Sequence, residues 1–316
     1  MPHDARRAYF AIRAFNIELA SIKDSKYSRR NKTSSSNSDG SGDDSNLALQ
    51  WWREALDYIY QNLSDEHNVA NESNSNPSTN KDDLSNLLAQ SYGKNPVVRM
   101  LQDAVHDKKL TRRFLERLLE AREMDLTVQQ PVTEQEMLDY ADAIQSSLIY
   151  LSLETCNVRN DAADQVAQHA GIGIGLVTAL RGARIRLSKS GEFPIPIELI
   201  ETRHDFPYHK LVLYDEEEAA KPQNQWTTEE RQMMQTAVEH VAGLAYYHLQ
   251  QAQETQNDVP KHARTCFLPV IPAMQYLQKL QAANYDIMDE PLLQQQGSGY
   301  LKTLFMMTRT WMTGVF

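Results

Sequence analysis

The chain has 316 residues, a net charge of −10 and two cysteines, Cys156 and Cys266. The acidic balance argues against broad nucleic-acid binding, which requires a basic surface that displaces counterions from phosphates. The sequence lacks the run of about 20 apolar residues that a membrane-spanning helix requires. The opening residues MPHDARRAYF lack the apolar core of a secretory signal. Two isolated cysteines make neither a disulfide framework nor a zinc site, so we predict that both are ordinary core residues.

Helical periodicity begins almost at the N-terminus and predicts three helices in the first half of the chain. They cover residues 5–23, 47–62 and 111–126, the last with Thr111 as its cap. Each carries an apolar stripe on one face. The stripes are Ile12, Phe15, Leu19 and Ile22; Trp51, Leu56, Ile59 and Tyr60; and Phe114, Leu115, Leu118 and Leu119.

Two polar tracts, residues 25–46 and 64–82, lie on either side of the second predicted helix. They consist mostly of Ser, Asn and Asp and have almost nothing to bury. This composition predicts disorder. We interpret the tracts as insertions into a helical domain, which cost little because closure entropy grows only logarithmically with loop length.

Two later helices carry their own start signals. Thr133 with Glu136, and Thr227 with Glu230, each match a capping box, in which the two side chains satisfy free backbone N–H groups. Each signal is followed by an apolar stripe at helical spacing. The stripes are Met137, Tyr140, Ile144, Leu148 and Leu151; and Met234, Ala237, Val238, Val241, Leu244 and Leu249.

The helix predicted at residues 161–181 is rich in small residues. Gly171, Gly173 and Gly175 each cost it about 1 kcal/mol relative to Ala, so packing against a neighbouring helix must compensate. Their spacing superficially suggests a dinucleotide-binding loop. That fingerprint requires a preceding strand, whereas the flanking residues here are helical. We therefore predict close helix packing.

Six blocks follow one another along the chain in a characteristic order. They are RAYFAIRAFNIELASIKD (7–24), WWREALDYIY (51–60), LTRRFLERLLEAREMDL (110–126), QSSLIYLSLE (145–154), HAGIGIGLVTALRGAR (169–184) and ANYDIMDEPLL (283–293). Together they resemble the squalene/phytoene synthase family, and more narrowly its branch of mitochondrial complex I assembly factors. The resemblance implies one all-α domain over residues 1–316, of the isoprenoid synthase type, with helices around a central cavity.

Synthases of this family ionise a prenyl diphosphate with Mg²⁺ that two aspartate-rich motifs hold. The position matching the first motif reads Ala20-Ser21-Ile22-Lys23-Asp24, and the second reads Gly182-Ala183-Arg184-Ile185-Arg186. Mg²⁺ requires hard oxygen ligands, yet Asp24 alone survives of the anchoring aspartates. The resemblance therefore predicts a non-catalytic relative, without metal or cofactor.

The matching segments retain polar residues that predict a residual ligand groove. These residues are Asn16, Asp24, Gln145, Thr178 and Arg181. The basic cluster at the second motif position has two interpretations. Its arginines either contact an anionic headgroup or diphosphate directly, or favour the dipole of a helix C-terminus. The cluster consists of Arg181, Arg184 and Arg186.

Two further sets of charged residues have alternative interpretations. Glu120, Glu123 and Asp125 either keep a polar role at the border of a pocket or form a solvated acidic helix end. His240 and His248 are spaced to share a helix face, but two ligands do not make a zinc site. We therefore expect structural or surface roles for the histidines.

The resemblance implies a role in the assembly of mitochondrial respiratory complex I, at the matrix face of the inner membrane. The implied partners are complex I subunits or other assembly factors, with peripheral membrane association and no nucleic acid. The import presequence is expected to lie outside this chain. Two other functions remain open: a Mg²⁺-dependent prenyl transferase of the squalene/phytoene type, and an isoprenoid- or lipid-binding module.

Overall fold

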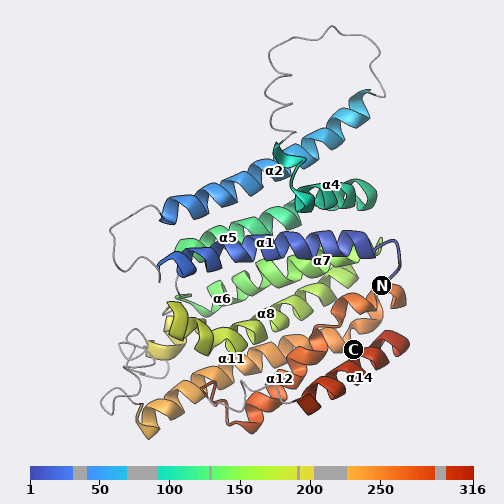
Figure 1. The fold of residues 1–316 in the computed structure, drawn as a ribbon. Coiled ribbons are helices and arrows are strands. Elements are labelled where there is room, and N and C mark those ends of the chain that lie inside the picture. Colours follow the sequence, from blue (N-terminus) through green and yellow to red (C-terminus); the bar gives the residue numbers. More distant parts are fainter. Residues whose placement is uncertain (31–40, 70–90, 128–129, 191–192, 203–225, 289–296) are drawn as a thin grey trace. The chain divides into compact units, whose positions relative to one another are not determined.

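The protein is described by a computed structural model in which the regular elements of the described residues are all helical, as predicted (Figure 1). The described residues are 1–30, 41–69, 91–127, 130–190, 193–202, 226–288 and 297–316. They form two compact units. Unit 1 comprises Met1–Leu126 and Leu151–Val158, and unit 2 comprises Thr127–Tyr150 and Arg159–Phe316. The single domain over residues 1–316 stays a prediction.

Unit 1 is organised around its first helix, whose predicted apolar stripe lies in the core. Its main helices are α1 (Arg6–Arg30), α2 (Ser41–Val69), α4 (Pro96–Lys108) and α5 (Arg112–Thr127). α1 packs against both α2 and α4. Ile12, Phe15 and Leu19 are fully or almost fully buried. Phe15 meets Trp52 of α2 edge to face, with ring centroids 5.2 Å apart.

The helices beside the first polar tract are longer than predicted. α1 continues to Arg30, and α2 begins at Ser41 and runs to Val69. Both ends of the first predicted disordered tract and the beginning of the second are therefore helical. Adding a residue to an existing helix costs far less than nucleating one, so polar residues can extend helices that apolar stripes anchor. The rest of the two tracts, 31–40 and 70–82, lies outside the described residues.

A buried carboxylate joins α5 to the end of α7 (Ser147–Thr155) within unit 1. Glu154 is 4% exposed and accepts a hydrogen bond from the backbone N–H of Thr111 at 2.8 Å. The hydroxyl of Thr111, which we expected to cap α5, also donates to Glu154. Beside them, the Tyr60 hydroxyl donates to the carbonyl oxygen of Leu110 at 2.8 Å. Burial raises the pKa of Tyr60, so this hydroxyl keeps its proton at neutral pH.

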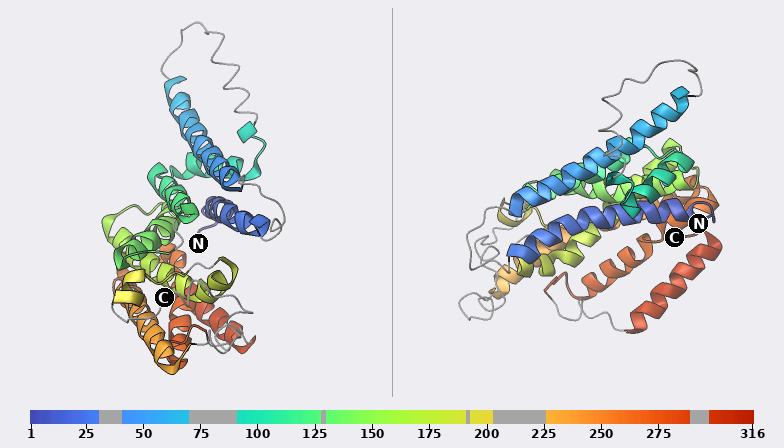
Figure 2. Two further views of the ribbon diagram at one scale, coloured as in Figure 1. Left: turned by 90° about the vertical axis from the view of Figure 1, so that its left-hand side faces the viewer. Right: turned by 45° about the horizontal axis from the view of Figure 1, so that its top comes forward.

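Unit 2 is built on two long helices that pack against each other (Figure 2). They are α8 (Asp161–Ser190) and α11 (Thr228–Glu254). Three shorter elements also pack on α8, namely α6 (Glu134–Ala141), the π turn η1 (Asp142–Ser146) and α12 (Val270–Ala282). α12 in turn contacts α14 (Gly297–Thr313). Among the helices of the described ranges, none is long and apolar enough to cross a membrane.

The two predicted capping boxes differ in how completely they form. At the start of α11, Thr227 and Glu230 make both reciprocal hydrogen bonds. At the start of α6, the Thr133 side chain accepts from the backbone N–H of Glu136, but the Glu136 carboxylate accepts from the N–H of Val132, at 2.8 Å. The helix that follows Thr133 is interrupted by the π turn before it continues as α7.

The glycines of α8 allow the close packing that the sequence predicts. A Cβ on Gly171 would overlap the backbone of Ser146 in the π turn, and one on Gly175 would lie 2.9 Å from Cα of Ala141. A Cβ on Gly173 would lie 2.6 Å from the side chain of Leu249. Moving the neighbouring backbone away from such a Cβ would cost free energy, because these groups belong to packed helices themselves. Packing therefore offsets the low helix propensity of these glycines.

We predict that Gly171→Ala lowers the free energy of unfolding by about 1–3 kcal/mol, because its Cβ has no space beside Ser146. Chemical denaturation followed by circular dichroism measures the change. The matched control is Gly243→Ala on α11, whose Cβ meets no atom within 4 Å. That substitution should raise stability by up to about 1 kcal/mol, since Ala is the better helix former. Equal effects of the two substitutions would contradict the packing account.

Candidate functional site

The five residues of the predicted ligand groove fall on three elements. Asn16 and Asp24 lie in α1 of unit 1, whereas Gln145 lies in the π turn and Thr178 and Arg181 lie in α8 of unit 2. Within unit 2, the π turn packs directly against α8. The hydroxyl of Thr178 donates to a carbonyl of its own helix at 2.8 Å. The groove as a whole stays a prediction.

Asn16 carries a buried acceptor with an unmet hydrogen bond. Within the described part of the chain, its Oδ1 has no donor, and the Nε of Arg13, one turn earlier, has no acceptor. The Arg13 guanidinium lies instead 5.0 Å from the ring centre of Tyr9. A buried polar atom left unsatisfied costs about 1–3 kcal/mol. A bound water or polar ligand that reached these atoms would recover part of that cost.

The position of the first aspartate motif is occupied by an ion-pair cluster. Lys23 Nζ lies 3.9 Å from Oδ1 of Asp125 in α5, and the two side chains are only 18% and 13% exposed. Asp125 also binds Arg122, at 2.9 Å. Two cations therefore already neutralise this carboxylate. It has little attraction left for a metal ion.

The acidic end of α5 is more structured than a solvated helix end. Glu123 binds Arg53 of α2 at 2.6 Å, and Glu120 binds Arg113 at 2.8 Å. With Asp125, each of the three carboxylates is therefore ion-paired. The Arg53–Glu123 pair connects two helices of unit 1, although exposed pairs of this kind contribute only about 0–1 kcal/mol each.

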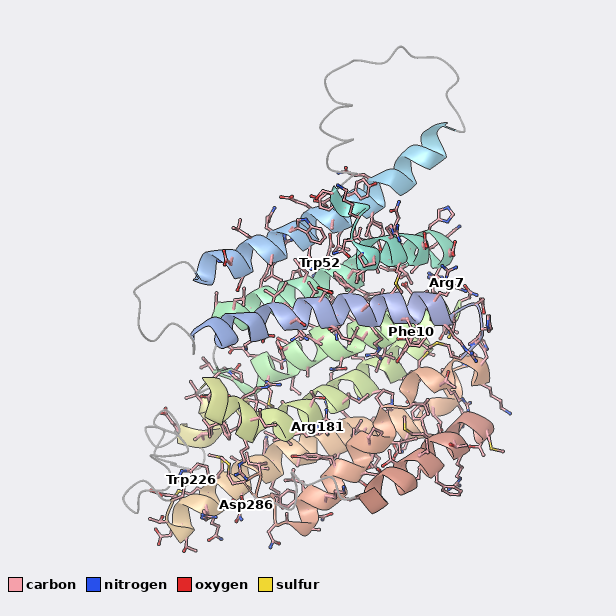
Figure 3. All side chains as sticks on the ribbon, viewed as in Figure 1. Arg7, Phe10, Trp52, Arg181, Trp226 and Asp286 are labelled. Carbon is pink, nitrogen blue, oxygen red and sulfur yellow. The ribbon has the colours of Figure 1, made fainter. Side chains whose placement is uncertain are left out.

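Arg184, at the second motif position, attaches α8 to a later segment of unit 2. Its guanidinium donates to the carbonyl oxygen of Met288 at 3.1 Å. The same segment is fixed by Asp286, which accepts from the N–H of Met288 at 2.9 Å and lies 3.8 Å from Arg231 of α11 (Figure 3). α8 continues to Ser190, so Arg184 does not lie in the last turn of its helix, as one interpretation required.

Arg181, labelled in Figure 3, is the exposed member of the basic cluster, whereas Arg184 and Arg186 are half-buried. It lies near Tyr276 of α12. Burial raises the pKa of Tyr276 to about 12, and the charge of Arg181 opposes that rise. Arg181 is thus the member of this cluster best placed to meet a solvent-borne anion.

The residues at the second motif position do not fit Mg²⁺. This ion requires near-octahedral coordination by hard oxygen donors. The second position offers Gly182, Ala183, Arg184, Ile185 and Arg186, none of which supplies a carboxylate. Over the described ranges, no three His, Cys, Asp or Glu residues lie in a metal-binding arrangement. The second position therefore offers none of the carboxylate donors that Mg²⁺ prefers.

A histidine pair that the sequence did not predict joins α8 to α11. His169 Nδ1 lies 3.0 Å from His248 Nδ1, so one ring donates and the other accepts. His240, expected to share a face with His248, bonds instead to Glu134 of α6 at 2.7 Å. Burial lowers the pKa of both paired histidines, and for His248 the charge of His169 adds to this while Asp142 opposes it.

From this histidine pair we predict that the protein loses stability in mild acid. An unfolded histidine titrates near pH ~6.5, and the folded pKa of His169 and His248 lies below that. Between these values the unfolded chain binds more protons, so the free energy of unfolding falls as the pH falls below about 6.5. Above that pH both forms are neutral and the pair makes no pH-dependent contribution. Urea titrations between about pH 5 and 8 measure the slope.

His248→Gln should make this slope shallower, because it removes one of the two histidines whose pKa is lowered in the folded protein. His262→Gln, a substitution of an exposed histidine, is the matched control and should leave the slope unchanged. An identical pH dependence of wild type and His248→Gln would contradict the assignment.

Comparison with known proteins identifies the family. A family model described as squalene/phytoene synthase matches residues 1–298. A cattle protein named NADH dehydrogenase (ubiquinone) complex I, assembly factor 6, is 28% identical over 94% of this chain and 72% of its own length. Its human counterpart is 27% identical over 98% of this chain and 75% of its own length. A Dictyostelium discoideum homolog is 28% identical over 92% of this chain and 66% of its own.

Solved structures agree on the fold. A squalene synthase from Alicyclobacillus acidocaldarius superposes with a TM-score of 0.63 at 14% identity, covering 90% of this chain and 86% of that one. A dehydrosqualene synthase in complex with a ligand gives 0.63 at 14% identity, over 98% of this chain and 88% of that one. The helical architecture is therefore of the isoprenoid synthase type. The chain belongs to the squalene/phytoene synthase family.

Proposed function

We propose that this protein is a non-catalytic member of the family that acts in the assembly of mitochondrial respiratory complex I. Relatives from mammals and from Dictyostelium discoideum, similar along most of this chain, are named as assembly factors of that complex. Its partners would be complex I subunits or other assembly factors. The protein would associate peripherally with the matrix face of the inner membrane.

The replacement of carboxylates by arginine at the second motif position carries the non-catalytic part of the proposal. A bound metal ion speeds diphosphate departure by neutralising the developing charge, so losing its ligands removes most of the rate. Here Arg184 is held by the Met288 carbonyl, and Lys23 by Asp125. Positive side chains thus lie at both motif positions, where they repel a divalent cation.

An isoprenoid- or lipid-binding role is the second candidate. The buried, unsatisfied Oδ1 of Asn16 favours it, since a ligand with a hydroxyl or other donor would satisfy this atom. Native mass spectrometry of the purified protein tests this candidate directly. A co-purified isoprenoid that is lost in Asn16→Leu would support it.

The purified protein should form no condensation product from farnesyl or geranylgeranyl diphosphate with Mg²⁺, because the leaving diphosphate has no metal clamp. Product extraction and pyrophosphate release measure the reaction, with an active bacterial squalene synthase as positive control. Condensation at enzymatic rates would refute the non-catalytic assignment and favour a prenyl transferase with unusual ligands.

Deleting the gene in its source organism should lower the amount and activity of assembled complex I, measured on native gels and by NADH oxidation. Gly243→Ala should restore assembly, whereas Gly171→Ala should restore less because its packing is compromised. Normal complex I together with altered isoprenoid pools would contradict the assembly role.

A further inference from the structure

The last helix of the described residues exposes several large apolar side chains on one side. Leu304, Phe305 and Met312 of α14 are 62%, 70% and 75% exposed, and Val315 just beyond it is 52% exposed. At helical spacing, Leu304, Phe305 and Met312 share one side of α14, together with Thr308 and Arg309. We call these residues and Val315 the α14 face. An exposed cluster of this kind usually marks an interaction surface.

The opposite side of α14 is firmly attached to unit 2. Gln275 of α12 donates to the sulfur of Met306 at 3.0 Å and accepts a hydrogen bond from the Thr303 hydroxyl. Figure 2 shows α14 (red) lying beside α12 (orange). These contacts fix the rotation of α14 about its axis. The α14 face is therefore held outward by the fold.

The end of α14 is clamped as well. Arg264, which is 7% exposed, donates to the carbonyl oxygen of Gly314 at 3.0 Å. Phe316 stacks on Phe267 with ring centroids 4.8 Å apart. Val315 thus lies between two anchored residues and still points its side chain into solvent.

The sequence of the C-terminal segment differs in charge from the rest of the chain. The protein carries a net charge of −10, yet residues 291–316 contain Lys302 and Arg309 and no aspartate or glutamate. Arg309 is exposed on the α14 face itself. A helix face that combines large exposed apolar side chains with an exposed arginine is complementary to a bilayer of anionic lipids.

The hydroxyl groups on and beside the α14 face already have their hydrogen bonds. The hydroxyl of Thr308 donates to the carbonyl oxygen of Leu304 at 2.8 Å, and that of Thr313 to Arg309 at 2.9 Å. Burying an unsatisfied hydroxyl in an apolar medium is costly, whereas a hydroxyl bonded within its own helix loses little. These hydroxyls can therefore enter the lipid headgroup boundary without needing new hydrogen-bond partners.

We propose that the α14 face is the surface by which this protein docks on an anionic lipid bilayer. α14 would lie in the plane of the interface, with its apolar side chains at the acyl boundary and Arg309 among the headgroup phosphates. A helix of this length covers about 25 Å along the surface. The proposal deepens the proposed function and rests on it for the membrane, because it names the surface of peripheral association.

Co-sedimentation with vesicles tests the proposal. The protein should bind vesicles of phosphatidylcholine mixed with phosphatidylglycerol, and bind pure phosphatidylcholine more weakly. Leu304→Ser with Phe305→Ser and Met312→Ser should reduce binding to the mixed vesicles at least about tenfold, since three apolar anchors are lost. Arg309→Gln should reduce it roughly fivefold on anionic vesicles alone.

The matched control changes exposed apolar residues in the other unit. Phe10 and Ile17 on α1 are 61% and 63% exposed (Figure 3 labels Phe10). Phe10→Ser with Ile17→Ser should keep full vesicle binding, and unchanged circular dichroism and melting would show that both variants fold. Loss of binding in the α1 variant, or retention in the α14 variant, would overturn the proposal.

Two other outcomes would also overturn the proposal. If wild type binds no vesicles and light scattering shows a dimer that the α14 variant abolishes, the face binds a second copy. If wild type binds no vesicles and remains a monomer, the face is no lipid surface. Complex I assembly is measured in the same α14 variant. This separates the lipid-docking proposal from the proposed assembly function, because vesicle binding can fail while assembly is intact.

Discussion

The close approach of α8 to the π turn is the constraint on which unit 2 depends. Gly171 and Gly175 leave no room for a side chain against Ser146 and Ala141. This contact sets the distance at which α8 lies from the elements that precede it. It also determines where the rest of α8 runs, including Arg181 and the second motif position. A backbone contact of this kind explains why helix-weakening residues occur in the middle of a long helix.

Cations with assigned partners characterise both motif positions. Lys23 pairs with Asp125 in unit 1, and Arg184 binds the Met288 carbonyl in unit 2. A family scaffold can therefore be kept by its packing and ion pairs after the carboxylates have gone. This separation of fold from chemistry is expected, since stability and function depend on different residues.

The helices could be predicted from sequence because their signals are local. Apolar spacing on α1 and the capping box at Thr227 each depend on residues within a few turns. The helix ends between residues 24 and 46 were predicted wrongly, because extension of an anchored helix depends little on apolar content. The glycines of α8 indicated a close contact, but their partners Ser146, Leu249 and Ala141 lie on other elements of unit 2.

The candidate site was harder to predict because its contacts are long-range. His169 and His248 are separated by most of α8 and α11, so neither spacing nor composition indicates that their Nδ1 atoms meet. The same holds for Arg184 and Met288. The missing carboxylates could be read from the sequence through the resemblance alone. The binding partners of the remaining cations could be identified only in the structure.

The central claim is that the scaffold persists without its magnesium chemistry. The most direct measurement is isothermal titration of Mg²⁺ into the protein in the presence of a non-reactive farnesyl diphosphate analogue. The account predicts no saturable heat beyond that of the analogue alone, because the second motif position carries no carboxylate. Saturable Mg²⁺ binding that requires both the protein and the analogue would contradict it.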